Sequence, residues 1–319
     1  MTHLAITETI AGLIGQYALT FITLVTVLVL LGMVVSWQLF NQYYGQLWQT
    51  GYSVWERLSA SAIAHKLWQT SPRFWGFLGR RLSPDSYLGL HLTVGFIISF
   101  ITFVMFGNLA KQVVEAEGVV RFDQELANAL YQNANALEIT LFHLITNLGG
   151  RMATIVIGLG VALWLLLRQH KLLLISWAVA IIGNSVLNFV LKFAFQRARP
   201  TFDNPLLVES FYSFPSGHAM GSVVMYGMLA YILSVLVADL RWKRMALACI
   251  TIWFILFIGF SRMYLGVHYF SDIAAGYAAG LGWLTIVITG TEVARRRSSG
   301  KLRQTESLEA NQPHPTQTT

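Results

Sequence analysis

The 319-residue sequence is poor in charge and almost free of cysteine. Only 12% of its residues are charged, against roughly 25% in soluble domains, which argues against a soluble globular protein. Its single cysteine, Cys249, excludes an intramolecular disulfide and is expected to be a small buried apolar residue. The alternating apolar pattern of an outer-membrane barrel is also missing, so helices remain as the membrane-spanning solution.

The sequence is instead rich in long apolar runs, with 55% hydrophobic residues and a mean hydropathy of +0.55. Each run is long enough to approach the ~30 Å of a bilayer core as a helix. The first run lacks a basic n-region and a clear cleavage site, so we interpret it as a retained helix and not a signal peptide. The seven predicted spans are Ala18–Leu39, Leu88–Leu109, Met152–Leu167, Leu172–Leu191, Gly217–Ala238, Met245–Phe260 and Ile273–Thr291.

The formal net charge of +7 follows the loops between these spans. Basic residues gather in the connections between spans one and two, three and four, and five and six, and after span seven. These four segments fall on one side, which the positive-inside rule makes cytoplasmic. The N-terminus is therefore expected outside and the C-terminus inside, and the charge indicates a lipid bilayer and not a nucleic-acid partner. The basic residues are Arg57, Lys66, Arg73, Arg80, Arg81, Arg168, Lys171, Arg241, Lys243, Arg244, Arg295, Arg296, Arg297, Lys301 and Arg303.

The predicted fold class is all-α, a polytopic membrane helical bundle with three regions. Residues 1–86 hold the first span and a cytoplasmic connector, whose Trp48–Phe77 stretch is either an interfacial amphipathic segment or a loosely packed loop. Residues 87–292 form a six-helix unit, and residues 293–319 form a polar tail that is expected to be disordered. In the acidic outside segment before the third span, Asp123 is predicted to cap a helix with the apolar face Leu126, Leu130, Leu137, Leu141 and Leu144.

Three groups of ionisable residues meet at the predicted outer edge of the membrane. They are far apart in sequence, and comprise Lys192 with Arg199, Ser216 with Gly217 and His218, and Arg262 with His268 and Asp272. The two arginines offer planar donor forks to phosphate oxygens, and Lys192 adds a point charge. Ser216 and the Gly217 amide lie at a helix start, which favours an anion. The sequence therefore predicts a phosphate site.

The histidines supply the chemistry for this site. His268 stands four residues before Asp272, a spacing that places both on one face if the segment is helical. The carboxylate can then hold one tautomer of a nucleophilic imidazole. His218 is left as the general acid that protonates the leaving group. Arg197, at an undefined position between Lys192 and Arg199, is expected to be a helix flank.

These residues resemble the three signature motifs of the type 2 phosphatidic acid phosphatases, which vanadium haloperoxidases share. The motifs are Lys192-x6-Arg199-Pro200, Pro215-Ser216-Gly217-His218 and Ser261-Arg262-x5-His268-x3-Asp272. The resemblance implies a six-helix membrane phosphatase that acts without a metal or other cofactor. In it His268 forms a phosphohistidine, Asp272 supports His268, His218 is the acid, and the three cations with Ser216 and Gly217 bind phosphate.

The substrate is expected to be a phospholipid or polyprenyl phosphate, such as phosphatidic acid, phosphatidylglycerol phosphate or undecaprenyl diphosphate, at the outer face of a bacterial cytoplasmic membrane. Two alternatives remain open. The same phosphohistidine could pass its phosphoryl group to an acceptor hydroxyl, which would make the protein a phosphotransferase. The scaffold could also be a non-catalytic lipid-binding or transport protein. The soluble haloperoxidases are disfavoured because this site lies among membrane spans.

Overall fold

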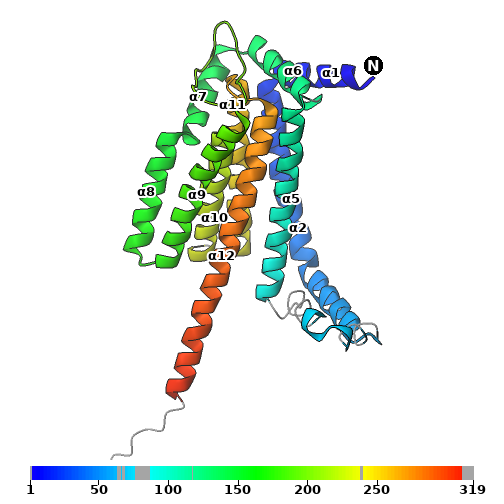
Figure 1. Ribbon diagram of the computed structural model, residues 1–319, viewed down its shortest axis with the longest axis vertical. Coiled ribbons are helices and arrows are strands. Elements are labelled where there is room, and N and C mark those ends of the chain that lie inside the picture. The colour runs from blue at the N-terminus through cyan, green and yellow to red at the C-terminus, as the bar shows by residue number, and fades with distance from the viewer. Residues whose placement is uncertain are drawn as a thin grey trace, which may run out of the picture.

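The computed structural model describes residues 2–62, 66, 69–75, 87–116, 118–237 and 240–310, and within these ranges the regular structure is helical. The helices form a bundle with α1 at one end and the C-terminal end of α12 at the other (Figure 1). The all-α prediction is confirmed. The helices are α1 (Thr2–Gln16), α2 (Ala18–Ser59), α5 (Tyr87–Val114), α6 (Gly118–Gln132), α7 (Ala136–Leu148), α8 (Arg151–Leu167), α9 (Lys171–Phe195), α10 (Gly217–Leu236), α11 (Arg241–Tyr264) and α12 (Phe270–Ala310).

Among the described residues, six helices are long and apolar enough to cross a membrane, and they lie in α2, α5, α9, α10, α11 and α12. The third predicted span, Met152–Leu167, corresponds to α8, which has 17 residues and so measures only about 26 Å at the usual rise. It forms a pair with α7 that is bent by 40° at the Gly149-Gly150 break, and the pair together is long enough for one span.

The N-terminal region differs from the prediction in its helix lengths. The helix α2 continues past the expected end at Leu39 to Ser59, and a separate helix, α1, precedes it. The first part of the Trp48–Phe77 segment, up to Ser59, therefore extends the first span as helix. Residues 63–65, 67, 68 and 76–86 lie outside the described part of the chain. Arg80 and Arg81 are among them, so the predictions for these two residues fall outside the described part as well.

The tail also differs, because α12 runs without a break to Ala310 while disorder was predicted from residue 293. Glu292 pairs with Arg295 at 2.7 Å, one turn away, and lies 4.0 Å from Arg296. Such pairs favour continued helix, and extending an existing helix avoids a new nucleation step. Residues 311–319 lie outside the described part.

The acidic segment forms two helices where one was expected. Asp123 is not a cap, since it lies within α6 and is buried. Leu126 and Leu130 are buried beside it, whereas Leu137, Leu141 and Leu144 of α7 are exposed. Residue Asn135, whose side chain accepts a hydrogen bond from the Glu138 amide, starts the second helix.

Close packing of α10 against α12 brings the sequence-distant motifs together. A Cβ at Gly276 would lie 2.8 Å from the carbonyl oxygen of Ser216, and one at Gly280 would lie 2.9 Å from that of Met220. Only glycine allows two membrane helices to approach this closely. As a result, the Ser216 amide donates to the Asp272 carbonyl at 3.0 Å.

Candidate active site

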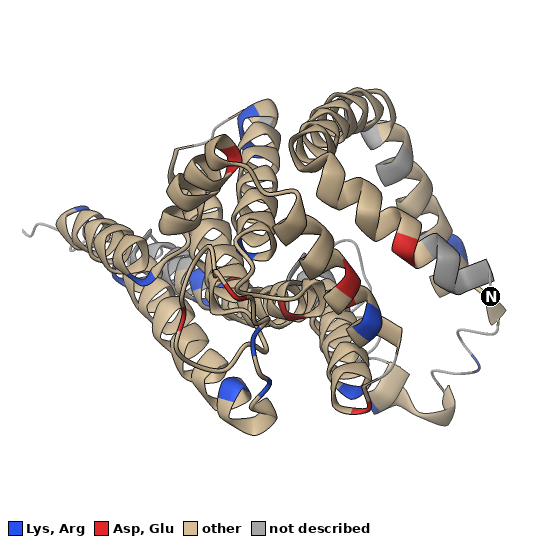
Figure 2. Cartoon of the chain, turned by 90° about the horizontal axis from the view of Figure 1, so that it is seen from above, with Lys and Arg blue, Asp and Glu red and all other residues tan. Residues whose placement is uncertain are grey.

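The predicted site residues gather at one end of the bundle, where α6, the loop 196–216 and the start of α12 meet. Figure 2 shows the molecule from this end: acidic and basic residues lie near one another, among helices that consist mostly of uncharged residues. The loop begins where α9 ends, at Gln196, which adopts the left-handed conformation (φ 46°) that commonly ends a helix. It closes at Ser216, the N-cap of α10, whose side chain accepts from the Ala219 amide.

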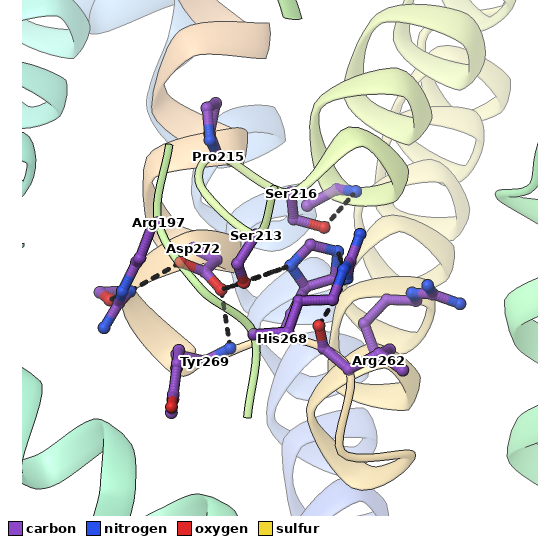
Figure 3. Close-up of polar contacts among 12 residues, drawn as sticks. Arg197, Ser213, Pro215, Ser216, Arg262, His268, Tyr269 and Asp272 are labelled. Atoms are coloured by element: carbon purple, nitrogen blue, oxygen red, sulfur yellow. Dashed lines mark hydrogen bonds and ion pairs between the residues drawn. The ribbon is translucent and has the colours of Figure 1, made fainter. Parts of the chain in front are cut away.

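His268 and Asp272 are in contact, although not on a single helix face. His268 precedes α12, and Asp272 lies in its first turn. The His268 Nδ1 atom lies 3.3 Å from Oδ2 of Asp272, and both side chains are buried (Figure 3). The same Asp272 oxygen accepts the Tyr269 amide at 2.9 Å, so the carboxylate reaches back over the helix start as in a capping box.

Arg199 contacts the opposite edge of the imidazole. Its Nη1 atom lies 3.1 Å from Nε2 of His268 and donates to the Val267 carbonyl at 2.6 Å. Burial, followed by the charges of Arg199, Arg262 and Lys192, holds the pKa of His268 well below its usual value. The imidazole is therefore neutral near pH 7, as a nucleophile must be.

Lys192 and Arg262 enter the site from α9 and α11. The Lys192 ammonium donates to the Tyr212 carbonyl and lies 3.5 Å from that of Ser213. Arg262 is 1% exposed, and its guanidinium donates to the Thr146 hydroxyl at 2.9 Å and to the Glu209 carboxylate at 2.7 Å. Its Nε atom is buried and has no hydrogen-bond partner among the described residues, so one donor is left for a ligand.

His218 lies in the first turn of α10, beside Gly217. A Cβ at Gly150 would lie 3.5 Å from its Nε2 atom, and one at Gly149 would lie 3.4 Å from its Cδ2 atom. The glycine pair that bends α7 against α8 thus also gives the His218 imidazole its space. Gly217 itself is constrained, because a Cβ there would approach Asn188 Oδ1 to 3.0 Å.

Three polar residues of this region were missed or misread from the sequence. Arg197 is not a helix flank: its guanidinium pairs with Asp272 at 2.6 Å and with Asp123 at 2.8 Å. Ser213 is fully buried, and its hydroxyl donates to Asp272 and lies 3.3 Å from His268 Nδ1. Glu209, the third of these residues, pairs with Arg262 at 2.7 Å. None of these positions belongs to a defined motif site, so spacing gave no signal for them.

The arrangement is that of an anion site beside a neutral, oriented imidazole. The described residues contain no group of three or more His, Cys, Asp or Glu arranged to hold a metal ion. The family model of the PAP2 superfamily matches residues 173–296, which include every one of the eight predicted site residues. This part of the chain is therefore similar to the PAP2 superfamily.

Two PAP2 relatives are similar to the chain. Phosphatidylglycerophosphatase B of Bacillus subtilis (strain 168) is 40% identical over 96 residues, which are 30% of this chain and 47% of that relative. The chain thus matches about half the length of this curated relative. A crystal structure of a transmembrane PAP2 type phosphatidylglycerolphosphate phosphatase from Bacillus subtilis is 28% identical, with a TM-score of 0.54, and covers 61% of this chain and 96% of its own.

Proposed function

We propose that the protein is a membrane lipid phosphate phosphatase in which His268 attacks phosphorus. The observation that carries the proposal is the position of the His268 imidazole, which lies 3.3 Å from Asp272 on one edge and 3.1 Å from the Arg199 guanidinium on the other. With Nδ1–H directed at the carboxylate, the Nε2 lone pair faces the place where Arg199 would hold a phosphoryl group. The PAP2 relatives with phosphatase names support the same reading.

The phosphate would be bound by Lys192, Arg199 and Arg262 with the amide end of α10 at Ser216 and Gly217. The free Nε–H of Arg262 gives this site a donor that no group in the described part of the chain uses. Guanidinium forks and a helix N-terminus suit the three equatorial oxygens of a phosphoryl group in transfer. The preferred substrates are lipids with a terminal phosphate, with phosphatidylglycerol phosphate first because of the relatives.

The reaction takes place in two balanced steps. An N–P bond forms between His268 Nε2 and phosphorus as the P–O bond to the lipid breaks, and His218 gives a proton to the leaving oxygen. Water then attacks the phosphohistidine, His218 takes up its proton, and the N–P bond breaks to release inorganic phosphate. Asp272 stabilises the positive charge that His268 carries in between.

The site would face the outside of a bacterial cytoplasmic membrane. The α8–α9 turn and the far end of α12, both basic, lie at the opposite end of the bundle from the site (Figure 1), and basic loops stay in the cytoplasm. Single cysteines test this orientation in a Cys249→Ala background. Asn204→Cys in the site loop should react with an impermeant maleimide on intact cells and Arg168→Cys should not. The reverse pattern would contradict the proposed orientation.

The proposed activity is tested by phosphate release from a panel of lipid phosphates in excess EDTA. The wild type should release phosphate, His268→Ala should not, and His170→Ala, at the opposite end of the bundle, should match the wild type. Full turnover by His268→Ala would exclude it as the nucleophile. Addition of a candidate acceptor alcohol then distinguishes hydrolysis from phosphotransfer, because a transferase would place labelled phosphate on the acceptor and not in solution.

A further inference from the structure

A buried chain of charges connects α6 to the His268–Asp272 pair. Arg197 lies in its centre, with 11% of its side chain exposed, while the side chains of Asp123 and Asp272 are fully buried. One guanidinium nitrogen of Arg197 donates to Asp272 at 2.6 Å and to the Ser271 hydroxyl at 2.7 Å, and another donates to Asp123 at 2.8 Å. The Tyr269 ring covers the guanidinium, with its centroid 4.3 Å from Cζ.

Arg197 determines which oxygen of Asp272 faces the imidazole. Asp272 Oδ1 accepts from Arg197, whereas Oδ2 accepts from the Ser213 hydroxyl and the Tyr269 amide and lies against His268 Nδ1. Figure 3 shows Asp272 between Arg197 on one side and Ser213 and His268 on the other. With Oδ1 held, the carboxylate cannot turn about its Cβ–Cγ bond, and the imidazole keeps one direction for its N–H.

Asp123 supplies α12 with the cap that its own sequence lacks. The N-cap position before Phe270 is Tyr269, which has no side-chain oxygen near the backbone to accept from the first free amides. Asp123, which lies on α6, takes this role: its Oδ1 accepts from the Ser271 amide at 2.9 Å, and its Oδ2 accepts from the Ser271 hydroxyl and from Arg197. Burial raises the pKa of Asp123, and the Ser271 and Arg197 donors oppose that rise. The Ser271 and Arg197 groups that contact Asp123 all donate to it.

We propose that Asp123 and Arg197 are positioning residues of catalysis that hold Asp272 and the start of α12 in register with His268. The proposal rests on the proposed function, since Asp272 must orient the nucleophile for the pair to matter. Neither residue is expected to touch the substrate. Asp123 lies on α6, outside the residues 173–296 that match the family, so this support comes from a part of the chain that the family match does not include.

The test uses the full chain in detergent with Asp123→Asn and Arg197→Lys. Asp123→Asn keeps the shape of the side chain and removes its charge. Arg197→Lys keeps the positive charge and removes the planar guanidinium, whose two nitrogens donate to Asp272 and Asp123. Glu125→Gln, a neutralised carboxylate on the same helix that pairs with Arg121, is the matched control. We expect kcat per active site to fall about 10–100-fold in both variants, the range seen when a carboxylate partner of a functional histidine is lost. KM and inhibition by inorganic phosphate should stay within about twofold, because the phosphate ligands are unchanged.

Active sites are counted by trapping the labelled phosphoenzyme, so that a merely misfolded fraction does not lower kcat per site. Unchanged kcat in both variants, or a raised KM with unchanged kcat, would overturn the proposal. If either variant fails to insert, Ser271→Ala removes one hydroxyl of the same network and should also lower kcat without a change in KM.

A second readout needs no turnover and separates this inference from the proposed function. Histidine labelled with ¹⁵N reports the His268 tautomer, with His268→Ala used to assign its signals. The wild type should show protonated Nδ1, and Asp123→Asn should show a mixture of both tautomers. Absence of phosphate release by the wild type would refute the proposed function, whereas an unchanged His268 spectrum in Asp123→Asn would refute the positioning role.

Discussion

Glu209 places a carboxylate on one of the expected phosphate ligands, and its removal gives the sharpest test of the site. The Glu209 side chain is 34% exposed, while that of its partner Arg262 is 2% exposed. A substrate phosphate that also binds the Nη2 atom of Arg262 must therefore compete with a protein carboxylate at 2.7 Å. Glu209→Gln keeps the side-chain length and removes this competing charge.

The expected magnitude follows from the partly exposed position of the pair. Ion pairs that are accessible to solvent contribute about 0.2–1 kcal/mol, and about 1 kcal/mol corresponds to a factor of about five in an equilibrium constant. We expect KM for a lipid phosphate, and the inhibition constant of inorganic phosphate, to fall up to about fivefold in Glu209→Gln. The value of kcat should stay unchanged, because the competition ends once the substrate is bound.

The assay compares steady-state phosphate release by Glu209→Gln with that by Asp203→Asn. Asp203 is an exposed carboxylate of the same loop, so its neutralisation changes the net charge equally without a contact to Arg262. A KM that rises in Glu209→Gln would refute the reasoning and show that the carboxylate orients Arg262 for binding. An equal fall of KM in both variants would assign the effect to the net negative charge of the loop and not to the contact between Glu209 and Arg262.

Three further predictions concern stability. Because the pKa of His268 is lowered on folding, the unfolded chain takes up a proton near pH 6.5 and the folded chain does not; stability should fall as pH drops below about 6.5, by up to about 1.4 kcal/mol per pH unit, and His268→Gln should lose this slope in detergent unfolding curves. Gly280→Ala should destabilise by about 1–3 kcal/mol because its Cβ would meet the α10 backbone at 2.9 Å, whereas Gly290→Ala, with nothing within 4 Å, should be neutral or slightly stabilising in thermal unfolding; equal effects would contradict the packing argument. Tyr264→Phe should cost about 1–3 kcal/mol because the buried Glu138 carboxylate loses its hydroxyl donor, and an unchanged melting temperature would show that this bond contributes nothing.

Much of the membrane architecture could be predicted because each span is a local property. A run such as Leu172–Leu191 has to form a helix in hydrocarbon, whatever its neighbours are, since its backbone can bond only to itself. The helix α9 accordingly includes that whole run. Helix ends were harder to predict: α2 and α12 extend beyond their apolar runs, because no lipid boundary or proline stops a helix that already exists.

The sequence by itself determined the helical class and the motif residues that meet at one end of the bundle. These follow from apolar length, loop charge and the spacing of Lys192, Arg199, His218 and His268. Only the tertiary structure decided what surrounds them: that Arg197 joins Asp123 to Asp272, and that Glu209 contacts Arg262. Asp123 comes from α6, and Arg197 and Glu209 come from the irregular loop 196–216. No repeating backbone geometry relates their separation in sequence to their separation in space. Their identity depends on how closely α10 and α12 pack, which is a property of the assembled bundle.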